Sequence, residues 1–175
     1  APLLSKERER ELLSFTKDNN LHFNNLRLLN LAFTHTSYAN EHKGAVDNNE
    51  RLEFLGDAVL GMITAEYLFS SFDRFHEGKF SKIKSVVVSE QSLSEVASAM
   101  HFERYLLVGH GEFSQGGTRK KAIQADAMEA VIAALYLDQG LEAAKNFVLS
   151  FIPVQVDKVL KNQVSYKDYK TVLQE

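Results

Sequence analysis

The sequence contains no cysteine and only two prolines in 175 residues. The missing cysteines exclude a disulfide framework and a thiolate metal site, and they are compatible with a reducing compartment. The two prolines, Pro2 and Pro153, stand near the two ends of the chain. The long stretch between them therefore lacks the residue that most strongly breaks helices. The pattern predicts a chain of successive helices.

Long apolar runs are missing as well. No run approaches the roughly 18 apolar residues that a membrane-spanning helix needs. The first eight residues, Ala1 to Arg8, contain no apolar core of the kind found in signal peptides. We therefore expect a cytoplasmic protein without membrane contact.

The chain has no excess of positive charge, since its formal net charge is −3. This argues against a protein that is held on nucleic acid by its overall charge. Two local basic clusters remain, one formed by Lys79, Lys82 and Lys84 and the other by Arg119, Lys120 and Lys121. Each cluster is also explained as an ordinary solvated face of a helix.

What the sequence does contain fits one all-α domain. Hydrophobic residues make up 45% and charged residues 25%, as in ordinary globular proteins. Capping residues and helical spacing predict helices over residues 5–17, 25–33, 49–71, 81–88, 92–100, 119–139, 141–152 and 153–161. The segments 81–88 and 92–100 also fit one continuous helix. Loops are expected at 38–48 and at the glycine-rich stretch 108–118.

The predicted helix 49–71 has an acidic face. On a helix, Glu50, Glu53 and Asp57 fall within a stripe about 60° wide, opposite a face of leucine, valine and isoleucine. Gly56 and Gly61 are unexpected inside it, because each costs about 1 kcal/mol relative to alanine. Close approach of a neighbouring helix would explain both glycines.

A second acidic pair lies in the most apolar predicted helix. Asp126 and Glu129 stand three residues apart, and no lysine or arginine occurs between Asp126 and Asp138. Carboxylates are rarely fully buried unless they are paired or bound to metal. Each could simply face solvent or meet a distant arginine. If the two acidic faces meet, however, four carboxylates share one cleft and need a cation to offset their repulsion.

Oxygen ligands without cysteine favour Mg²⁺ or Mn²⁺ over zinc or copper. Paired metals of this kind serve in-line displacement at phosphorus, because one activates water and the other stabilises the leaving oxygen. The residues alone therefore predict metal-dependent hydrolysis of a phosphodiester or a pyrophosphate. They leave the substrate open.

The segment Asn49 to Asp57, which reads NERLEFLGD, resembles the signature of the ribonuclease III family. Three further segments match in order: Phe33 to Tyr38, Glu77-Gly78, and Asp126 to Ala130. The resemblance extends roughly from Asn25 to Phe151. It implies an all-α endonuclease domain that forms a homodimer and cleaves double-stranded RNA.

The resemblance also implies residue roles. Glu53, Asp57, Asp126 and Glu129 match the metal-binding carboxylates, and Asp57 and Glu129 are the central catalytic candidates. Glu50 and Glu77 match two further acidic residues that help to form the cleavage site in the dimer. Phe54 matches an aromatic residue that inserts into the partner subunit. The implied products carry 5′-phosphate and 3′-hydroxyl ends with short 3′ overhangs, and the implied substrates are precursors of ribosomal, messenger and other RNAs.

The resemblance divides the chain at residue 161. Residues 1–161 correspond to the catalytic domain. Residues 162–175 correspond to a linker and, from Tyr166, to the start of a double-stranded-RNA-binding domain that the sequence does not continue. Gly44 and the glycine-rich loop 108–118, together with Arg119, Lys120 and Lys121, are candidates for contact with the RNA backbone. His35 is expected to make a structural hydrogen bond, and the other histidines show no ligand spacing.

Three alternatives remain open at this stage. An all-α nucleotide pyrophosphohydrolase also places carboxylates three residues apart around magnesium, although its acidic motif differs in order. A di-iron bundle uses Glu-x-x-His pairs, which do not occur in this sequence. A ribonuclease III-like domain that only binds RNA is the third, although all six acidic positions are intact.

Overall fold

The computed structural model describes residues 3–162, and the regular elements within them are helices. The elements are α1 (Lys6–Asp18), α2 (Leu26–Ala32), α3 (Thr36–Glu41), α4 (Glu50–Ser71), α5 (Glu77–Val87), α6 (Glu90–Ala99), η1 (Phe102–Arg104), α7 (His110–Ser114), η2 (Gly117–Arg119), α8 (Lys121–Gln139) and α9 (Leu141–Leu149). A further helical segment covers residues 152–162. The described part contains no strand beyond one isolated bridge between Thr34 and Leu107, so the all-α prediction is confirmed.

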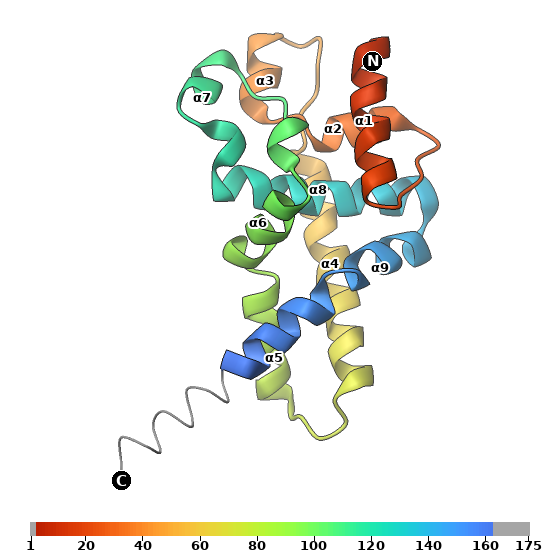
Figure 1. Cartoon of the computed structure of the whole chain (residues 1–175), viewed down its shortest axis with the longest axis vertical. Helices are drawn as coiled ribbons and strands as arrows, with labels where there is room; N and C mark the ends of the chain where they lie inside the picture. Colours follow the sequence, from red (N-terminus) through yellow and green to blue (C-terminus); the bar gives the residue numbers. More distant parts are fainter. Residues whose placement is uncertain (1–2, 163–175) are drawn as a thin grey trace.

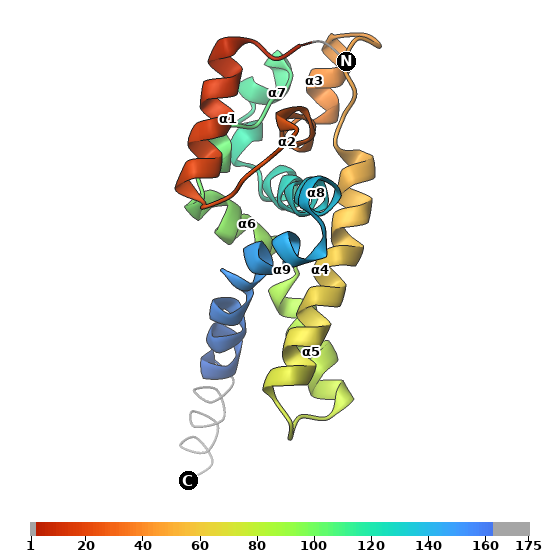
Figure 2. The ribbon, with the colours of Figure 1, turned by 90° about the vertical axis from the view of Figure 1, so that its right-hand side faces the viewer.

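Helix α8 forms the centre of the fold. Ten of its residues between Ile123 and Leu135 are hydrophobic and buried, and α4, α6, α9 and α2 all pack against it. Figure 2 shows α8 in the middle of the upper part, with α2 above it, α4 beside it and α9 below it. A helix that is apolar nearly all round belongs inside the core. The two acidic residues in α8 are therefore the exceptions that need explaining.

Helix α4 extends well beyond the region that α8 covers (Figure 1). It has 22 residues, and at about 1.5 Å per residue it is roughly 33 Å long. Its far end turns into α5, which packs back along it. One part of α4 therefore packs against α8, and its far end packs against α5.

The predicted starts of two helices are wrong. Helix α5 begins at Glu77, so Ser81 lies inside the helix instead of capping it. Helix α6 begins after Ser89, whose Oγ accepts a hydrogen bond from the backbone N–H of Ser92 at 3.3 Å. The two helices are separate, which decides against one continuous helix. Ser92 is instead buried, where its Oγ accepts a hydrogen bond from Gln155 at 2.9 Å.

Two predicted loops contain short helices. Helix α3 overlaps the beginning of 38–48. Helix α7 lies within 108–118, and η2 extends across the end of that stretch. The backbone N–H of His110 donates to Glu41 Oε1 at 2.6 Å, which ties the start of α7 to the end of α3. Helix α9 also ends at Leu149, short of the predicted residue 152.

No helix among residues 3–162 is both long and apolar enough to cross a membrane. The predicted division at residue 161 falls at the edge of the described range. The predicted start of an RNA-binding domain from Tyr166 lies outside it.

Candidate metal centre

The acidic residues meet where α4 crosses α8, and Gly56 makes the crossing close. A Cβ atom built on Gly56 would lie 1.7 Å from the backbone carbonyl oxygen of Glu129. Only glycine fits there, so the predicted close approach is confirmed at Gly56. It is wrong at Gly61, where a Cβ atom would meet only the side chain of Lys84, at 3.5 Å from its Nζ atom.

Three of the four predicted metal ligands come together at this crossing. Glu53 of α4 and Asp126 and Glu129 of α8 each have a carboxylate oxygen, and these oxygens lie within 4.8 Å of one another. All three side chains are half-buried. Asp57 is exposed and lies close enough to Glu129 to help raise the pKa of that carboxyl. The four carboxylates thus form one cluster at the edge of the core.

Burial and mutual repulsion change the proton affinity of this cluster. Burial, reinforced by the neighbouring Asp57, raises the pKa of Glu129 to about 9. Burial and then the charge of Asp126 raise the pKa of Glu53 to about 7. Burial also raises the pKa of Asp126. Without a cation, the cluster therefore retains protons at neutral pH and shares them between neighbouring carboxylates.

The donor set fits a hard divalent cation. Two oxygens on one magnesium ion lie at most about 4.2 Å apart, because each Mg–O bond is about 2.1 Å long. Small side-chain rotations bring oxygens within 4.8 Å into that range. Carboxylates that hold protons for lack of positive charge are the groups that a metal ion would deprotonate. We conclude that Glu53, Asp126 and Glu129 can hold a metal ion.

The other two predicted acidic residues lie at opposite ends of α4. Glu50 is exposed in its first turn, close enough for its charge to contribute to the raised pKa of Glu53. Glu77 begins α5, beyond the far end of α4. The length of α4 separates Glu77 from the cluster, so a single protomer does not bring it there.

Two residues near Asp126 were not predicted as part of the site. The negative charge of Glu90 raises the pKa of Asp126, and the ring of His35 lowers it. Glu90 follows the cap of α6 and is far from both acidic helices in sequence, so local spacing could not reveal it. The structural role expected of His35 is confirmed, because its Nδ1 accepts a hydrogen bond from the backbone N–H of Ser37 at 3.1 Å.

The second basic cluster is partly engaged within the protein. Lys120 Nζ lies 3.0 Å from Glu112 Oε1, and Lys121 Nζ lies 2.5 Å from Gln91 Oε1. Both lysines flank the start of α8. Their contacts are compatible with a surface role, and contact with RNA stays a prediction.

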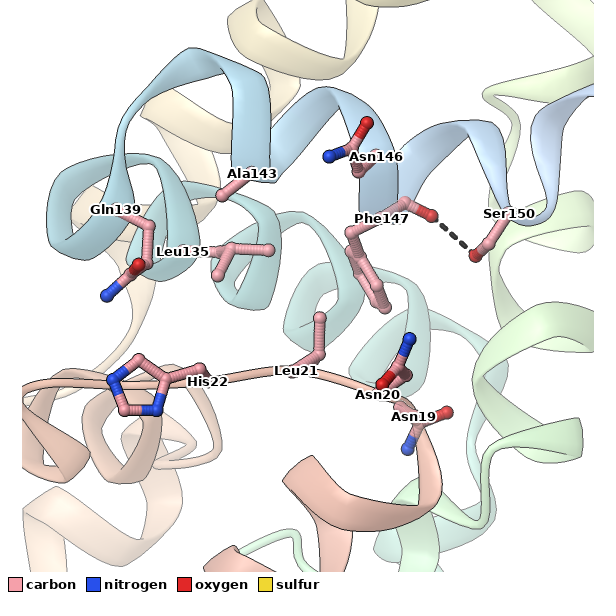
Figure 3. Close-up of a pocket in the computed structure, with 10 residues that line it drawn as sticks. All are labelled: Asn19, Asn20, Leu21, His22, Leu135, Gln139, Ala143, Asn146, Phe147 and Ser150. Atoms are coloured by element: carbon pink, nitrogen blue, oxygen red, sulfur yellow. Dashed lines mark hydrogen bonds between the residues drawn. The ribbon is translucent and has the colours of Figure 1, made fainter.

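A separate pocket, whose lining is drawn in Figure 3, contains none of the residues of the acidic cluster. It has a volume of about 280 Å³ and lies between the segment 19–22 and helices α8 and α9. Its lining contains amide and apolar side chains, with one histidine and one serine, but no carboxylate. The acidic cluster is therefore the stronger candidate for catalysis.

Helix α4 also exposes an apolar stripe next to the cluster. Phe54 is 83% exposed, Met62 49% and Phe69 76%. Together with the exposed Ala58 and Ala65, these residues fall within about 80° of the helix surface. We call these five residues the α4 stripe. A stripe this apolar is typical of a surface that another protein covers.

The comparisons with known proteins agree with this geometry. A family model described as ribonuclease-III-like matches residues 25–155, which is most of the chain. The chain belongs to the ribonuclease III family. Ribonuclease 3 of Treponema denticola is 50% identical over 172 residues, which cover 98% of this chain and 70% of that protein. Ribonuclease 3 of Streptococcus pyogenes serotype M1 is 48% identical over 166 residues, which cover 94% of this chain and 70% of that protein.

Solved structures support the same assignment. The nuclease domain of ribonuclease III from Campylobacter jejuni superposes with a TM-score of 0.75 at 38% identity, covering 81% of this chain and 95% of that chain. That protein is described as flexible in a region involved in dimer formation. The protein is thus an endoribonuclease of the ribonuclease III family. The pyrophosphohydrolase and di-iron alternatives lose their basis.

Proposed function

We propose that this ribonuclease III cleaves double-stranded RNA by metal-dependent hydrolysis of phosphodiester bonds. The observation that carries the proposal is the cluster of Glu53, Asp126 and Glu129, with Asp57 at its exposed edge. Such a cluster opens to solvent on one side, where a phosphate can approach. The named relatives are all ribonucleases 3, which favours RNA over a free nucleotide as the substrate.

The cluster would hold Mg²⁺, with Mn²⁺ as a substitute, through Glu53, Asp126 and Glu129. A bound divalent cation lowers the pKa of water and neutralises charge on the phosphate. The protein's own part is to hold the carboxylates in place, because the close crossing at Gly56 fixes the two helices. Asp57 stays accessible beside Glu129 and is placed to accept a proton from an attacking water.

The α4 stripe supports a homodimer. In a two-fold interface, the same patch of both subunits meets itself. The stripe extends from Phe54 to Phe69, so its midpoint is near Met62. A two-fold axis that crosses α4 there pairs the two helices antiparallel, and Phe54 then packs against the far half of the partner's stripe.

The antiparallel arrangement also gives Glu77 a role. It brings the end of one α4, and the start of the α5 that follows, to the beginning of the other α4. Glu53 and its cluster lie at that beginning. Each cleavage site would thus combine one subunit's cluster and Glu50 with the partner subunit's Glu77. This explains why a residue with a matching signature lies far from the cluster within one protomer.

Two such sites in a dimer would each cut one strand of the duplex. We infer products with 5′-phosphate and 3′-hydroxyl ends and short 3′ overhangs. Recognition would use the shape, phosphates and 2′-hydroxyls of the duplex, because the A-form major groove is too narrow to read. Ribosomal and other RNA precursors that fold into long hairpins are suitable substrates.

The test is cleavage of a long, perfectly paired RNA at low salt, with magnesium or with chelator. We expect magnesium-dependent cutting, no cutting of single-stranded RNA or duplex DNA, and loss of cutting in Glu129→Gln and Asp57→Asn with fold and dimer intact. Binding of the duplex without any cleavage by the wild type would point to an RNA-binding module instead. Cleavage that survives in Glu129→Gln would remove the cluster from the mechanism.

A further inference from the structure

The first turns of α5 contain an unusual hydrogen bond. Ser81 Oγ donates to Glu77 Oε1 at 2.6 Å, across one turn of the helix, and both residues are exposed. The bond links Glu77, the first residue of α5, to the serine four residues later. It leaves the second carboxylate oxygen of Glu77, Oε2, outside this contact.

Two other hydroxyls, one in α4 and one in α5 itself, behave differently. Thr64 Oγ1 donates to the carbonyl of Leu60 at 2.7 Å, and Ser85 Oγ donates to the carbonyl of Lys82 at 2.7 Å. Such back-bonding to the preceding turn is the usual local choice of a helical serine or threonine. Ser81 instead donates its hydroxyl proton to a side chain. Its partner is the acidic residue that the proposed dimer delivers to the other subunit's cluster.

The contact has a physical consequence for Glu77. A glutamate in solvent samples many rotamers, and fixing one of them costs conformational entropy. A hydrogen bond that already selects a rotamer reduces what remains to be ordered when substrate arrives. Ser81 lies one turn after Glu77 on the same face of α5. It can therefore restrain the Glu77 carboxylate from the side of its own helix and leave the opposite side of the carboxylate open.

We propose that Ser81 is a positioning residue that holds the Glu77 carboxylate in the orientation it needs at the partner subunit's cleavage site. This inference rests on the proposed function, because it assumes that Glu77 acts in cleavage. Within one protomer, the side-chain hydrogen bond of Ser81 is to Glu77 and not to the cluster. Its effect must therefore pass through Glu77.

The test compares four single variants and one double variant with the wild type in the duplex-RNA cleavage assay. Ser81→Ala removes the hydroxyl, Ser81→Thr keeps it, and Ser85→Ala is the matched control on the same helix, because its hydroxyl serves only the backbone. Glu77→Gln tests the residue through which Ser81 acts. Combining Ser81→Ala with Glu77→Gln then completes a double-mutant cycle.

We expect Ser81→Ala to lower kcat about tenfold, the lower end of the effect of removing a residue that orients a site. KM, the melting temperature and the dimer should not change, and Ser81→Thr should restore most of the activity. Ser85→Ala should match the wild type. In the Glu77→Gln background, Ser81→Ala should have no further effect.

Several outcomes would overturn the inference. Full kcat in Ser81→Ala, when Glu77→Gln is impaired, shows that Glu77 needs no restraint from Ser81. An additional loss from Ser81→Ala in the Glu77→Gln background shows that Ser81 acts elsewhere. A lower melting temperature that accounts for the lost activity assigns Ser81 to helix stability. Full activity in Glu77→Gln instead refutes the role of Glu77 in the proposed function, which is a separate failure.

Discussion

The backbone carbonyl oxygen of Glu129 occupies the place that a side chain on Gly56 would take. A Cβ atom at Gly56 would lie 1.7 Å from that oxygen, so α4 and α8 can touch only because residue 56 is glycine. Glu53 lies one turn before Gly56, and Asp57 follows it directly. One close contact between two backbones therefore sets the spacing of the acidic cluster.

The first prediction concerns this contact. Gly56→Ala should force the helices apart, which costs about 1–3 kcal/mol in a packed interior. For a domain of this size, that corresponds to a fall in melting temperature of roughly 3–10 °C. Cleavage should fall as well, because the carboxylates separate. Thermal unfolding by circular dichroism and the duplex-RNA assay measure the two effects.

Gly61→Ala is the matched control in the same helix. Its new Cβ atom would meet only the flexible end of Lys84, 3.5 Å from Nζ. Alanine is favoured over glycine in a helix by about 1 kcal/mol, so this variant should be as stable as the wild type or more stable. Equal melting temperatures for the two alanine variants would show that the close contact does not restrain the crossing.

The sequence was sufficient to pick out the carboxylates that form the acidic cluster. Glu53, Asp126 and Glu129 follow helical spacing within two strongly apolar segments, and the structure brings them together. The long helices α4 and α8 were predicted for the same reason, because many residues contribute to their periodicity. Sequence spacing has no means to show that Glu90 and His35 lie beside Asp126.

The errors in the fold have a related cause. Ser81, Ser89 and Ser92 are all suitable caps, and local sequence does not decide among them. The structure selects Ser89 for α6, while Ser92 is used in a buried contact with Gln155. Helices α3 and α7 are short and depend on hydrogen bonds between segments distant in sequence, such as that from His110 to Glu41. Periodicity over so few residues carries little information.

The second prediction is that stability without metal falls as pH rises. The pKa of Glu129 is about 9 in the folded protein against an ordinary value of 4.5, and that of Glu53 is about 7. At a pH between the ordinary pKa of a glutamate and its raised pKa in the folded protein, the folded protein binds more protons than the unfolded chain. The free energy of unfolding therefore decreases as pH rises through this interval. The stabilisation by the protonated carboxyls is fully present at a pH below their ordinary pKa, and it is lost as pH rises through their raised pKa in the folded protein. Thermal unfolding with chelator, from about pH 6 to about pH 9, measures it.

Glu129→Gln separates this effect from general alkaline destabilisation. Glutamine stays neutral, so the variant should lose much of the slope. At the alkaline end it should melt about 2–4 °C above the wild type, which corresponds to about 1 kcal/mol. Glu7→Gln, at an exposed position in α1, is the control and should keep the wild-type slope. Parallel curves for wild type and Glu129→Gln would mean that Glu129 is ionised in the folded protein.

The third prediction concerns metal affinity. Because Glu129 and Glu53 retain protons near neutral pH, a divalent cation must displace them, and binding should tighten as pH rises. The expected change is about tenfold per pH unit for each proton displaced. Calorimetric titration with Mn²⁺ in buffers of different ionisation enthalpy counts the protons released. Affinity that does not vary between about pH 6 and about pH 8, with no protons released, would contradict the raised pKa values.

The last prediction tests the dimer axis. A residue on a two-fold axis meets its own copy, so Met62→Asp should place two carboxylates in contact at the centre of the α4 stripe. Sedimentation equilibrium should show a monomer, and cleavage should fall by about 100-fold, because each site loses the partner subunit's Glu77 and a site with misplaced groups loses about that much rate. Leu13→Asp is the control, since Leu13 on α1 is 52% exposed, like Met62 at 49%, but lies outside the stripe. Both variants should keep the helical spectrum, because neither side chain belongs to the protomer core. A Met62→Asp protein that remains dimeric would move the axis away from Met62, and the explanation for the distant Glu77 would fail with it.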